Sequence, residues 1–258
     1  MSLTGRSIYI VDIKKILHAE GERLFLERCR DARFTSIWIR VGRGQGRDPN
    51  MRHQITRTIR TECANLGISV WGWHVPFCKT ESDAKLEADL AAEWVVDANF
   101  SGLIIDAERT KHPPRFQGGR HEAQAYVERL NVLLQGKLAF SSHDRPSLHN
   151  DLPFSIFIDK INDVLPQVYY KYRNVSERLE KSMNDYASAG LATQLKERFK
   201  PTGNISVLGD LPVGTEKQCI DATKAFIARV KVIGLTGYSF WCWDDAPEEI
   251  WPLLAATN

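Results

Sequence analysis

Two acidic side chains, Asp106 and Glu108, end a short apolar segment near the middle of the chain (residues 101–108, SGLIIDAE). The apolar run is typical of a buried strand, in which residues i and i+2 point to the same side with Cα atoms about 6.5 Å apart. A carboxyl group beside a second carboxylate has a raised pKa, so such a pair separates into an acid and a base. Because paired carboxyl groups of this kind cleave glycosidic bonds, the spacing predicts glycoside chemistry at Asp106 and Glu108.

The elements that must position this pair alternate between strand and helix. Short segments rich in β-branched and aromatic residues predict eight strands, each followed by a longer helical pattern. The strands are expected at residues 7–12, 36–42, 68–76, 102–108, 137–143, 165–170, 204–209 and 237–243. The helices are expected at residues 20–32, 51–66, 81–98, 120–135, 155–162, 176–199, 215–233 and 247–255.

This alternation predicts the fold class. Eight strand–helix units in 258 residues match the roughly 250 residues of a (β/α)8 barrel. No linker of changed composition divides the chain. We therefore expect an α/β protein, a TIM barrel that forms a single domain over residues 1–258; a doubly wound open sheet is the alternative.

The bulk composition narrows the class of protein. The chain has 34 basic and 32 acidic residues and a formal net charge of +2, which argues against recognition of nucleic acid or an anionic membrane by charge. Five cysteines lie far apart without metal-site spacing, so unpaired thiols and no metal or cofactor are expected. The N-terminal residues lack the layout of a signal peptide, and no apolar run approaches the length of a membrane helix. We expect a cytoplasmic protein, or one released to the cell wall by another route.

Polar residues gather where the predicted strands end. In a TIM barrel the reacting groups lie at the C-terminal ends of the strands, so these positions are candidates for a site. The candidates are Asp12, Arg40, His74, Asp106, Glu108, Ser142, His143, Asp144, Gln167, Tyr169, Asp210, Trp241, Trp243, Asp244 and Asp245.

Alternation along the strands predicts which candidates point into the barrel. In residues 102–108 it places Asp106 and Glu108 inside, opposite aliphatic neighbours. The same reasoning places Asp12 and Arg40 inside. A buried arginine near three carboxylates would lower their pKa values and keep them from all becoming neutral. The alternative for Asp12 and Arg40 is an ion-pair network that closes the barrel mouth.

The third predicted strand presents two tryptophans on one face and a small and a polar residue on the other. Gly72 and His74 suit a crowded interior, so they are expected to point inward. Trp71 and Trp73 are then expected to pack beneath the helices, and the opposite orientation, with the tryptophans inside the barrel, is the alternative.

The last predicted strand carries Trp241 and Trp243 on a shared face. An aromatic ring at a barrel mouth is a common platform for the apolar face of a sugar. Trp243 is nearest the rim and is expected to line a glycan subsite, with a role in the core as the alternative.

The segment around the acidic pair resembles the active-site strand of two glycoside hydrolase families. Against the family 18 chitinase pattern D-G-x-D-x-D-x-E, residues 101–108 keep the glycine, the last aspartate and the glutamate, while Ser101 and Ile104 replace the first two aspartates. The family 25 lysozymes need only D-x-E there. The chain is similar to them over residues 7–110, through Asp12, residues 39–44 (IRVGRG) with Asp48, and residues 66–77 (LGISVWGWHVPF). It thus resembles a divergent TIM-barrel glycoside hydrolase of lysozyme type, and more distantly a chitinase.

The resemblance implies a hydrolase of β-linked glycans that contain N-acetylhexosamine, with peptidoglycan first and chitin-like polymers second. Glu108 would be the general acid, Asp106 would orient the 2-acetamido group or stabilise positive charge, and Asp12 would act on Asp106 electrostatically. Tyr169 would hydrogen-bond the acetamido group, and Asp244 or Asp245 would activate water if the reaction inverts. The substrate-binding side chains would be Arg40, His74, Gln167, Tyr169, Trp241, Trp243 and Asp244.

Two other functions fit the same residues. Asp12, His74, Asp106, Glu108 and His143 could bind a divalent metal and make the chain a metal-dependent hydrolase, although an H-x-H motif is missing. A barrel that binds glycans without cleaving them is the other alternative, because Ile104 stands where chitinases carry an aspartate.

Overall fold

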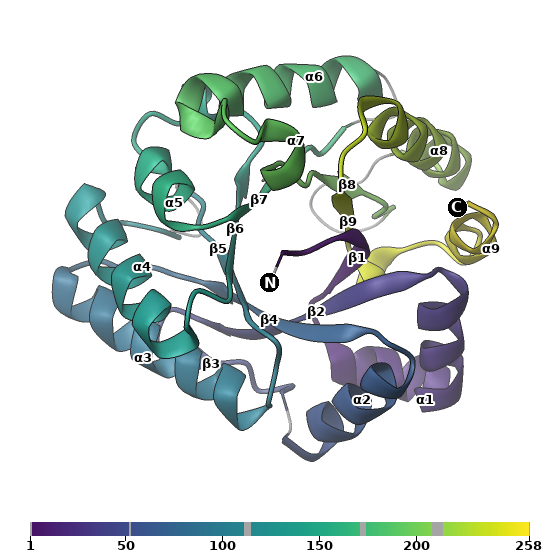
Figure 1. Ribbon diagram of the computed structural model, residues 1–258. Coiled ribbons are helices and arrows are strands. Elements are labelled where there is room, and N and C mark those ends of the chain that lie inside the picture. Colours follow the sequence, from purple (N-terminus) through teal and green to yellow (C-terminus); the bar gives the residue numbers. More distant parts are fainter. Residues whose placement is uncertain (1, 52, 111–114, 171–173, 208–213, 258) are drawn as a thin grey trace.

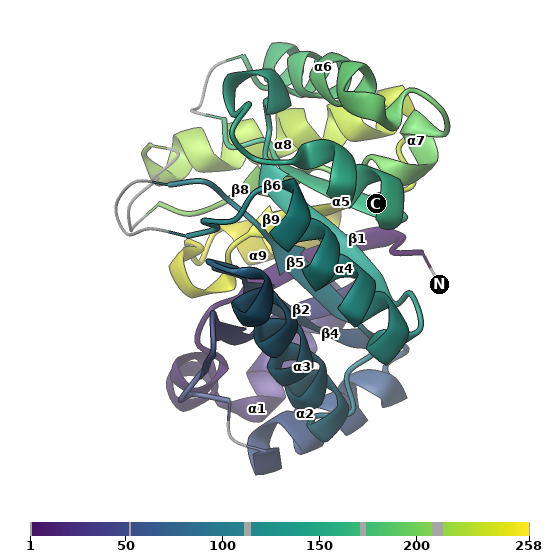
Figure 2. The ribbon, with the colours of Figure 1, turned by 90° about the vertical axis from the view of Figure 1, so that its left-hand side faces the viewer.

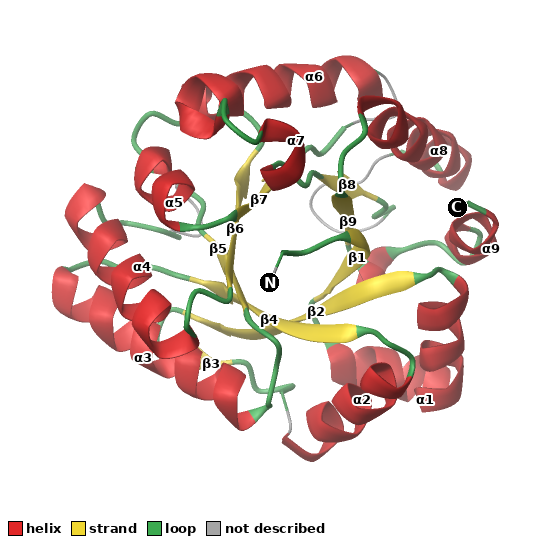
Figure 3. Ribbon diagram, viewed as in Figure 1, coloured by secondary structure: helices red, strands yellow, loops and turns green. Residues whose placement is uncertain are grey.

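The computed structural model describes residues 2–51, 53–110, 115–170, 174–207 and 214–257 (Figure 1). Parallel strands form a closed barrel with helices around it, as the view coloured by secondary structure shows (Figure 3). The barrel strands are β1 (Gly5–Ile10), β2 (Phe34–Arg43), β4 (Ser69–Val75), β5 (Leu103–Asp106), β6 (Leu138–His143), β7 (Asp163–Gln167), β8 (Thr202–Asn204) and β9 (Gly237–Trp241). The short strand β3 (Gly46–Arg47) pairs antiparallel with the end of β2.

The order β1-β9-β8-β7-β6-β5-β4-β2 is closed by pairing of β1 with β2. The predicted TIM barrel is therefore confirmed, and the open sheet is wrong. The surrounding helices are α1 (Ile13–Asp31), α2 (His53–Asn65), α3 (Glu81–Asp97), α4 (Arg120–Leu134), α5 (Phe154–Lys160), α6 (Val175–Tyr186), α7 (Leu195–Arg198), α8 (Glu216–Ile233) and α9 (Ile250–Ala256). In the side view the N-terminus lies at the right-hand end of the barrel (Figure 2).

Several element boundaries differ from the expected ones for local reasons. Helix α1 begins at Ile13, not residue 20, because the Asp12 side chain accepts a hydrogen bond from the Lys15 amide at 3.0 Å and caps the helix. The helix expected over residues 176–199 is divided, because Gly190 has a φ of 118°. The strand expected at 204–209 is β8 (Thr202–Asn204). Residues 208–210, including the candidate Asp210, lie outside the described residues.

Apolar side chains form one layer between strands and helices and a second cluster inside the barrel. The inner cluster is rich in large aromatic residues: Tyr9, Trp38, Trp71 and Trp73. The ring of Trp71 fits because the neighbouring Gly102 has no side chain. A side chain at Gly102 would overlap the ring of Trp71, which explains why a glycine precedes the acidic strand.

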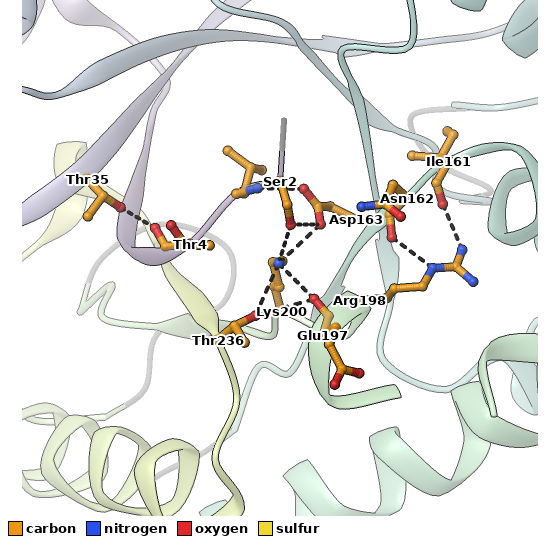
Figure 4. A network of polar contacts seen from close by, with 11 residues as sticks. Ser2, Thr4, Thr35, Ile161, Asn162, Asp163, Glu197, Arg198, Lys200 and Thr236 are labelled. Atoms are coloured by element: carbon orange, nitrogen blue, oxygen red, sulfur yellow. Dashed lines mark hydrogen bonds and ion pairs between the residues drawn. The ribbon is translucent and has the colours of Figure 1, made fainter. Parts of the chain in front are cut away.

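A buried ion pair lies where the N-terminal segment meets the barrel (Figure 4). Lys200 Nζ lies 3.1 Å from Asp163 Oδ1, and both side chains are at most 2% exposed. Lys200 also donates to the Glu197 carbonyl at 2.8 Å and to Ser2 Oγ at 2.9 Å. Asp163 in turn accepts from the Leu3 amide at 2.6 Å. Because each charge has several partners, the pair holds the start of the chain against β7 and β8.

All five cysteines are buried and unpaired, as predicted. Burial raises the pKa of the Cys63 thiol to about 12, so this thiol stays protonated. Within the described ranges, no helix is long and apolar enough to cross a membrane.

Candidate active site

The acidic pair, Asp106 and Glu108, lies at the C-terminal end of β5. The side-chain amide of Gln167 donates a hydrogen bond to each of the two carboxyl groups. Asp106 is the last residue of β5 and 3% exposed, and Glu108 follows two residues later and is 9% exposed. Gln167 Nε2, from the end of β7, donates to Asp106 Oδ1 and to Glu108 Oε1, each at 2.8 Å. The structure thus brings together Asp106, Glu108 and Gln167, three residues that the sequence singled out.

Strand register explains why these side chains meet. On β5, Ile104 points into the inner cluster, and Asp106 lies one step further along the same face. Asp106 pairs with Ser141 on β6, whose hydroxyl donates to Asp106 Oδ1 at 3.0 Å. Ser141 was not among the predicted site residues, although alternation from Ala139, which also lies in the inner cluster, places it on the same face.

Arg115 supplies the countercharge of the pair. Its Nη1 lies 2.5 Å from Glu108 Oε1 and 3.9 Å from Asp106 Oδ2. Burial works against the charge of Arg115, but the two nearby carboxyl groups raise its pKa. Arg115 belongs to the segment between β5 and α4, and no periodic pattern of the sequence marks it.

The two carboxyl groups have different environments. Burial, and then the charge of Glu108, raise the pKa of Asp106 to about 7, against the opposing effects of Arg115 and of the hydrogen bonds from Ser141 and Gln167. Near neutral pH a proton therefore resides on Asp106 for a substantial part of the time.

The raised pKa of Asp106 predicts how stability depends on pH. An unfolded aspartate titrates near pH 3.9, so the folded state binds an extra proton between about pH 4 and about pH 7. The contribution of Asp106 to the unfolding free energy is largest below this window and is lost as the pH rises through it. We expect Asp106→Asn, which stays neutral, to gain stability relative to the unmodified protein over this range. Urea unfolding of both proteins from pH 4 to pH 8 measures the difference, and parallel curves would contradict the assignment.

Aromatic side chains pack against one another beside the acidic pair. Tyr169 follows β7, and its ring centroid lies 6.3 Å from that of Trp241 at the end of β9. Trp241 in turn lies 5.7 Å from Trp73 and 5.5 Å from Tyr9. Burial, and then the charges of Glu108 and Asp106, raise the pKa of Tyr169, so its hydroxyl remains a hydrogen-bond donor. We call the rings of Tyr169, Trp241, Trp73 and Tyr9 the aromatic wall. It offers an apolar surface and, at the Tyr169 hydroxyl, a hydrogen-bond donor, which are the two contacts that a sugar ring needs.

The faces of β4 are opposite to those expected. Trp71 and Trp73 belong to the inner cluster, and Trp73 Nε1 donates to the Ile10 carbonyl at 3.0 Å. His74 is fully buried on the helix side, between Tyr126 Oη at 2.7 Å and the Gly44 carbonyl at 2.8 Å. Burial lowers the pKa of His74 to about 4. The prediction that His74 binds substrate is therefore wrong.

Asp12 and Asp244 have structural partners instead of a place beside the acidic pair. β1 ends at Ile10, so alternation does not reach Asp12, which caps α1 and accepts from Asn50 Nδ2 at 2.8 Å. Asp244 accepts from the amides of Val11 and Asp12 at 2.8 and 2.7 Å. Its carboxylate holds the end of β1 in place. The inward position expected for Asp12 is wrong, and the substrate contact of Asp244 stays a prediction.

Trp243 is a core residue, which was the alternative interpretation of this tryptophan. β9 ends at Trp241 and a 3-10 turn follows, so the two tryptophans do not share a face. Trp243 is 2% exposed and packs on Phe25 at 4.6 Å and Trp251 at 4.4 Å between ring centroids. The rim position expected for Trp243 belongs to Trp241, which is partly exposed.

Arg40 lies on the inner side of β2, as expected. It forms an ion pair with Asp48, and its guanidinium lies 5.7 Å from the centroid of Trp73. The predicted ion-pair alternative thus holds for Arg40, but with Asp48 and not Asp12 as its partner.

The residues of the metal alternative do not converge. His74 lies beneath the helices and Asp12 at the start of α1, away from the acidic pair. His143 stacks on His149 with ring centroids 3.7 Å apart. In the described part of the chain, no three His, Cys, Asp or Glu side chains are placed to hold a metal ion.

Comparisons with known proteins agree with the geometry of the fold. No family model and no curated protein sequence matches the chain. A chitinase from Bacteroides thetaiotaomicron has a TM-score of 0.72 at 10% identity, over 99% of this chain and 95% of its own. The active domain 2 of a thermostable chitinase from Pyrococcus furiosus has a TM-score of 0.69 at 11% identity, over 94% and 84%. A family 18 chitinase from Cycas revoluta has a TM-score of 0.68 at 10% identity, over 97% and 98%. The resemblance to family 25 lysozymes is not shown by these structures, whereas the chain shares the barrel fold of chitinases.

Proposed function

We propose that this protein is a glycoside hydrolase that cleaves β-linked glycans containing N-acetylhexosamine. The observation that carries the proposal is the Asp106–Glu108 pair at the end of β5, joined through the Gln167 amide at 2.8 Å to each carboxyl group. The chitinase fold of the structural neighbours supports it, and one of them was crystallised with chito-oligosaccharides. Chitin-like polymers and peptidoglycan are the two substrates of this class that we consider.

In the proposed mechanism Glu108 is the general acid. Its carboxyl proton passes to the glycosidic oxygen while the acetamido oxygen of the substrate attacks the anomeric carbon and the glycosidic bond breaks. Water then attacks the same carbon, the bond between that carbon and the acetamido oxygen breaks, and the water gives one proton to the Glu108 carboxylate. Gln167 and Ser141 hold Asp106 where its side chain can orient the acetamido group.

The aromatic wall and Arg115 complete the proposed mechanism. Trp241 provides a surface for the sugar, and the Tyr169 hydroxyl donates to the acetamido oxygen. Arg115 must move away from Glu108 before the acid step, because its guanidinium lies 2.5 Å from Glu108 Oε1 and stands between that oxygen and a substrate.

The role of the acetamido group provides the test. If its oxygen is the nucleophile, the protein should hydrolyse an aryl β-glycoside of diacetylchitobiose and should fail on the aryl glycoside of cellobiose, which has hydroxyl groups at the same positions. Release of the aryl alcohol measures both rates. Equal hydrolysis of the two compounds would contradict the proposed mechanism, and hydrolysis of neither would contradict the proposed activity.

The contact between Arg115 and Glu108 favours one competing function. A barrel in which this ion pair stays closed would bind glycan without turnover, because Glu108 could not deliver a proton. Retention of the protein on insoluble chitin or peptidoglycan, without release of soluble sugar, would favour this function over catalysis.

A further inference from the structure

Arginine side chains gather at one side of the barrel mouth, next to the acidic pair. On β2, Arg40 pairs in register with Trp73 and Arg43 with Val75, and both partners belong to the inner cluster. A side chain at Gly42 would overlap the ring of Trp94 on α3, so this position faces the helices. Arg43 is the next residue along the strand and therefore turns toward the mouth.

Two of the three arginines on this side of the mouth have a carboxylate within ion-pair distance. Arg40 is paired with Asp48, and Arg115 is paired with Glu108. Arg43 is exposed, and its side chain has no hydrogen bond or ion pair with any residue that the structure describes. Burial, and then the nearby charges of Arg115 and Arg40, lower the pKa of Arg43, while the charges of Asp106 and Asp48 oppose this effect.

A carboxylate on the glycan would give the Arg43 guanidinium the ion-pair partner that Arg40 and Arg115 already have. A guanidinium binds a carboxylate through paired hydrogen bonds, whereas the hydroxyl and acetamido groups of a neutral chitin chain carry no charge to offset it. Arg43 also lies close enough to Asp106 for the two charges to interact, so its partner must sit near the cleaved bond.

We propose that Arg43 binds a carboxylate on a sugar adjacent to the cleaved linkage, so that the preferred substrate is an acidic N-acetylhexosamine glycan and not neutral chitin. This inference rests on the proposed function for the position of the cleaved bond. Two kinds of sugar could carry the carboxylate that Arg43 binds: a hexosamine with a carboxyalkyl ether, and a uronic acid with its C6 carboxylate.

The test compares three oligosaccharides of equal length. One is neutral chitotetraose, one carries a carboxyalkyl ether on alternate sugars, and one alternates N-acetylhexosamine with uronic acid. We expect kcat/KM for at least one acidic oligosaccharide to exceed that for chitotetraose by about 10- to 100-fold, the typical effect of a charged hydrogen bond. The arm that shows this preference identifies the source of the carboxylate.

Arg43→Gln is expected to remove most of this preference through an increase in KM for the acidic oligosaccharide. Arg47→Gln is the matched control, because Arg47 lies on the same hairpin but pairs with Asp97 at 3.5 Å. Arg47→Gln should keep the preference unchanged. A wild-type protein without preference, or an equal loss in both variants, would overturn the inference while hydrolysis itself continues.

Calorimetric binding of the same oligosaccharides separates this inference from the proposed function. If no oligosaccharide is cleaved, the proposed activity fails, and tighter binding of an acidic oligosaccharide that depends on Arg43 still supports the subsite. If binding of the acidic oligosaccharides is absent or unaffected by Arg43→Gln, the subsite is wrong.

Discussion

Replacement of Glu108 by glutamine is expected to lower turnover of an N-acetylhexosamine glycan by about 10²- to 10⁴-fold, the usual contribution of a general acid. Glutamine keeps the size of the side chain and an oxygen that can accept the Gln167 hydrogen bond, which is 2.8 Å long in the present structure. It cannot donate the proton that the leaving oxygen requires. Reducing-sugar release by the two proteins measures the effect, and circular dichroism checks the fold.

Asp12→Asn is the matched control for Glu108→Gln. It also changes a carboxylate to an amide near the end of a barrel strand, but Asp12 caps α1 and an asparagine caps a helix equally well. Activity should stay close to that of the unmodified protein. A large loss in Asp12→Asn would restore the catalytic role that the sequence predicted for Asp12, and undiminished turnover by Glu108→Gln would remove Glu108 from the mechanism.

The second large effect is on stability and concerns the other end of the barrel. Lys200→Met is expected to lower the unfolding free energy by about 3–5 kcal/mol, the typical cost of removing one partner of a buried ion pair. The variant leaves Asp163, whose side chain is 1% exposed, without a countercharge. Three hydrogen-bond acceptors of Lys200 also lose their donor: Ser2, Glu197 and Thr236. Urea unfolding followed by circular dichroism measures the change.

Lys217→Met serves as the control for Lys200→Met. It breaks the ion pair with Asp221 on the surface of α8, where the two side chains are 85% and 56% exposed. Water replaces an exposed ion pair at little cost, so the unfolding midpoint should hardly move. Equal midpoints for Lys200→Met and Lys217→Met would show that the buried pair does not hold the N-terminal segment in the barrel.

The barrel and the position of the acidic pair were predictable from the sequence. Runs of β-branched and aromatic residues recur with the spacing of strand–helix units, and that spacing needs no tertiary information. The same period of two placed Ile104 and Asp106 on the inner face of β5. Alternation failed at β4 because it divides a strand into two faces without saying which is inner. Trp71 faces inward because Gly102 leaves room for its ring, and Trp73 lies two residues further along the same face.

The sequence by itself determined the number of barrel strands, the closed barrel and the strand that carries Asp106 and Glu108. Only the tertiary structure decided their partners. Gln167 lies 59 residues from Glu108 along the chain, and Arg115 lies in a segment without periodicity. Barrel closure sets the distances of such groups from the acidic pair. Asp12, Asp244 and His74 form hydrogen bonds with residues of neighbouring elements. Such contacts leave no pattern in the local sequence, so only the tertiary structure shows them.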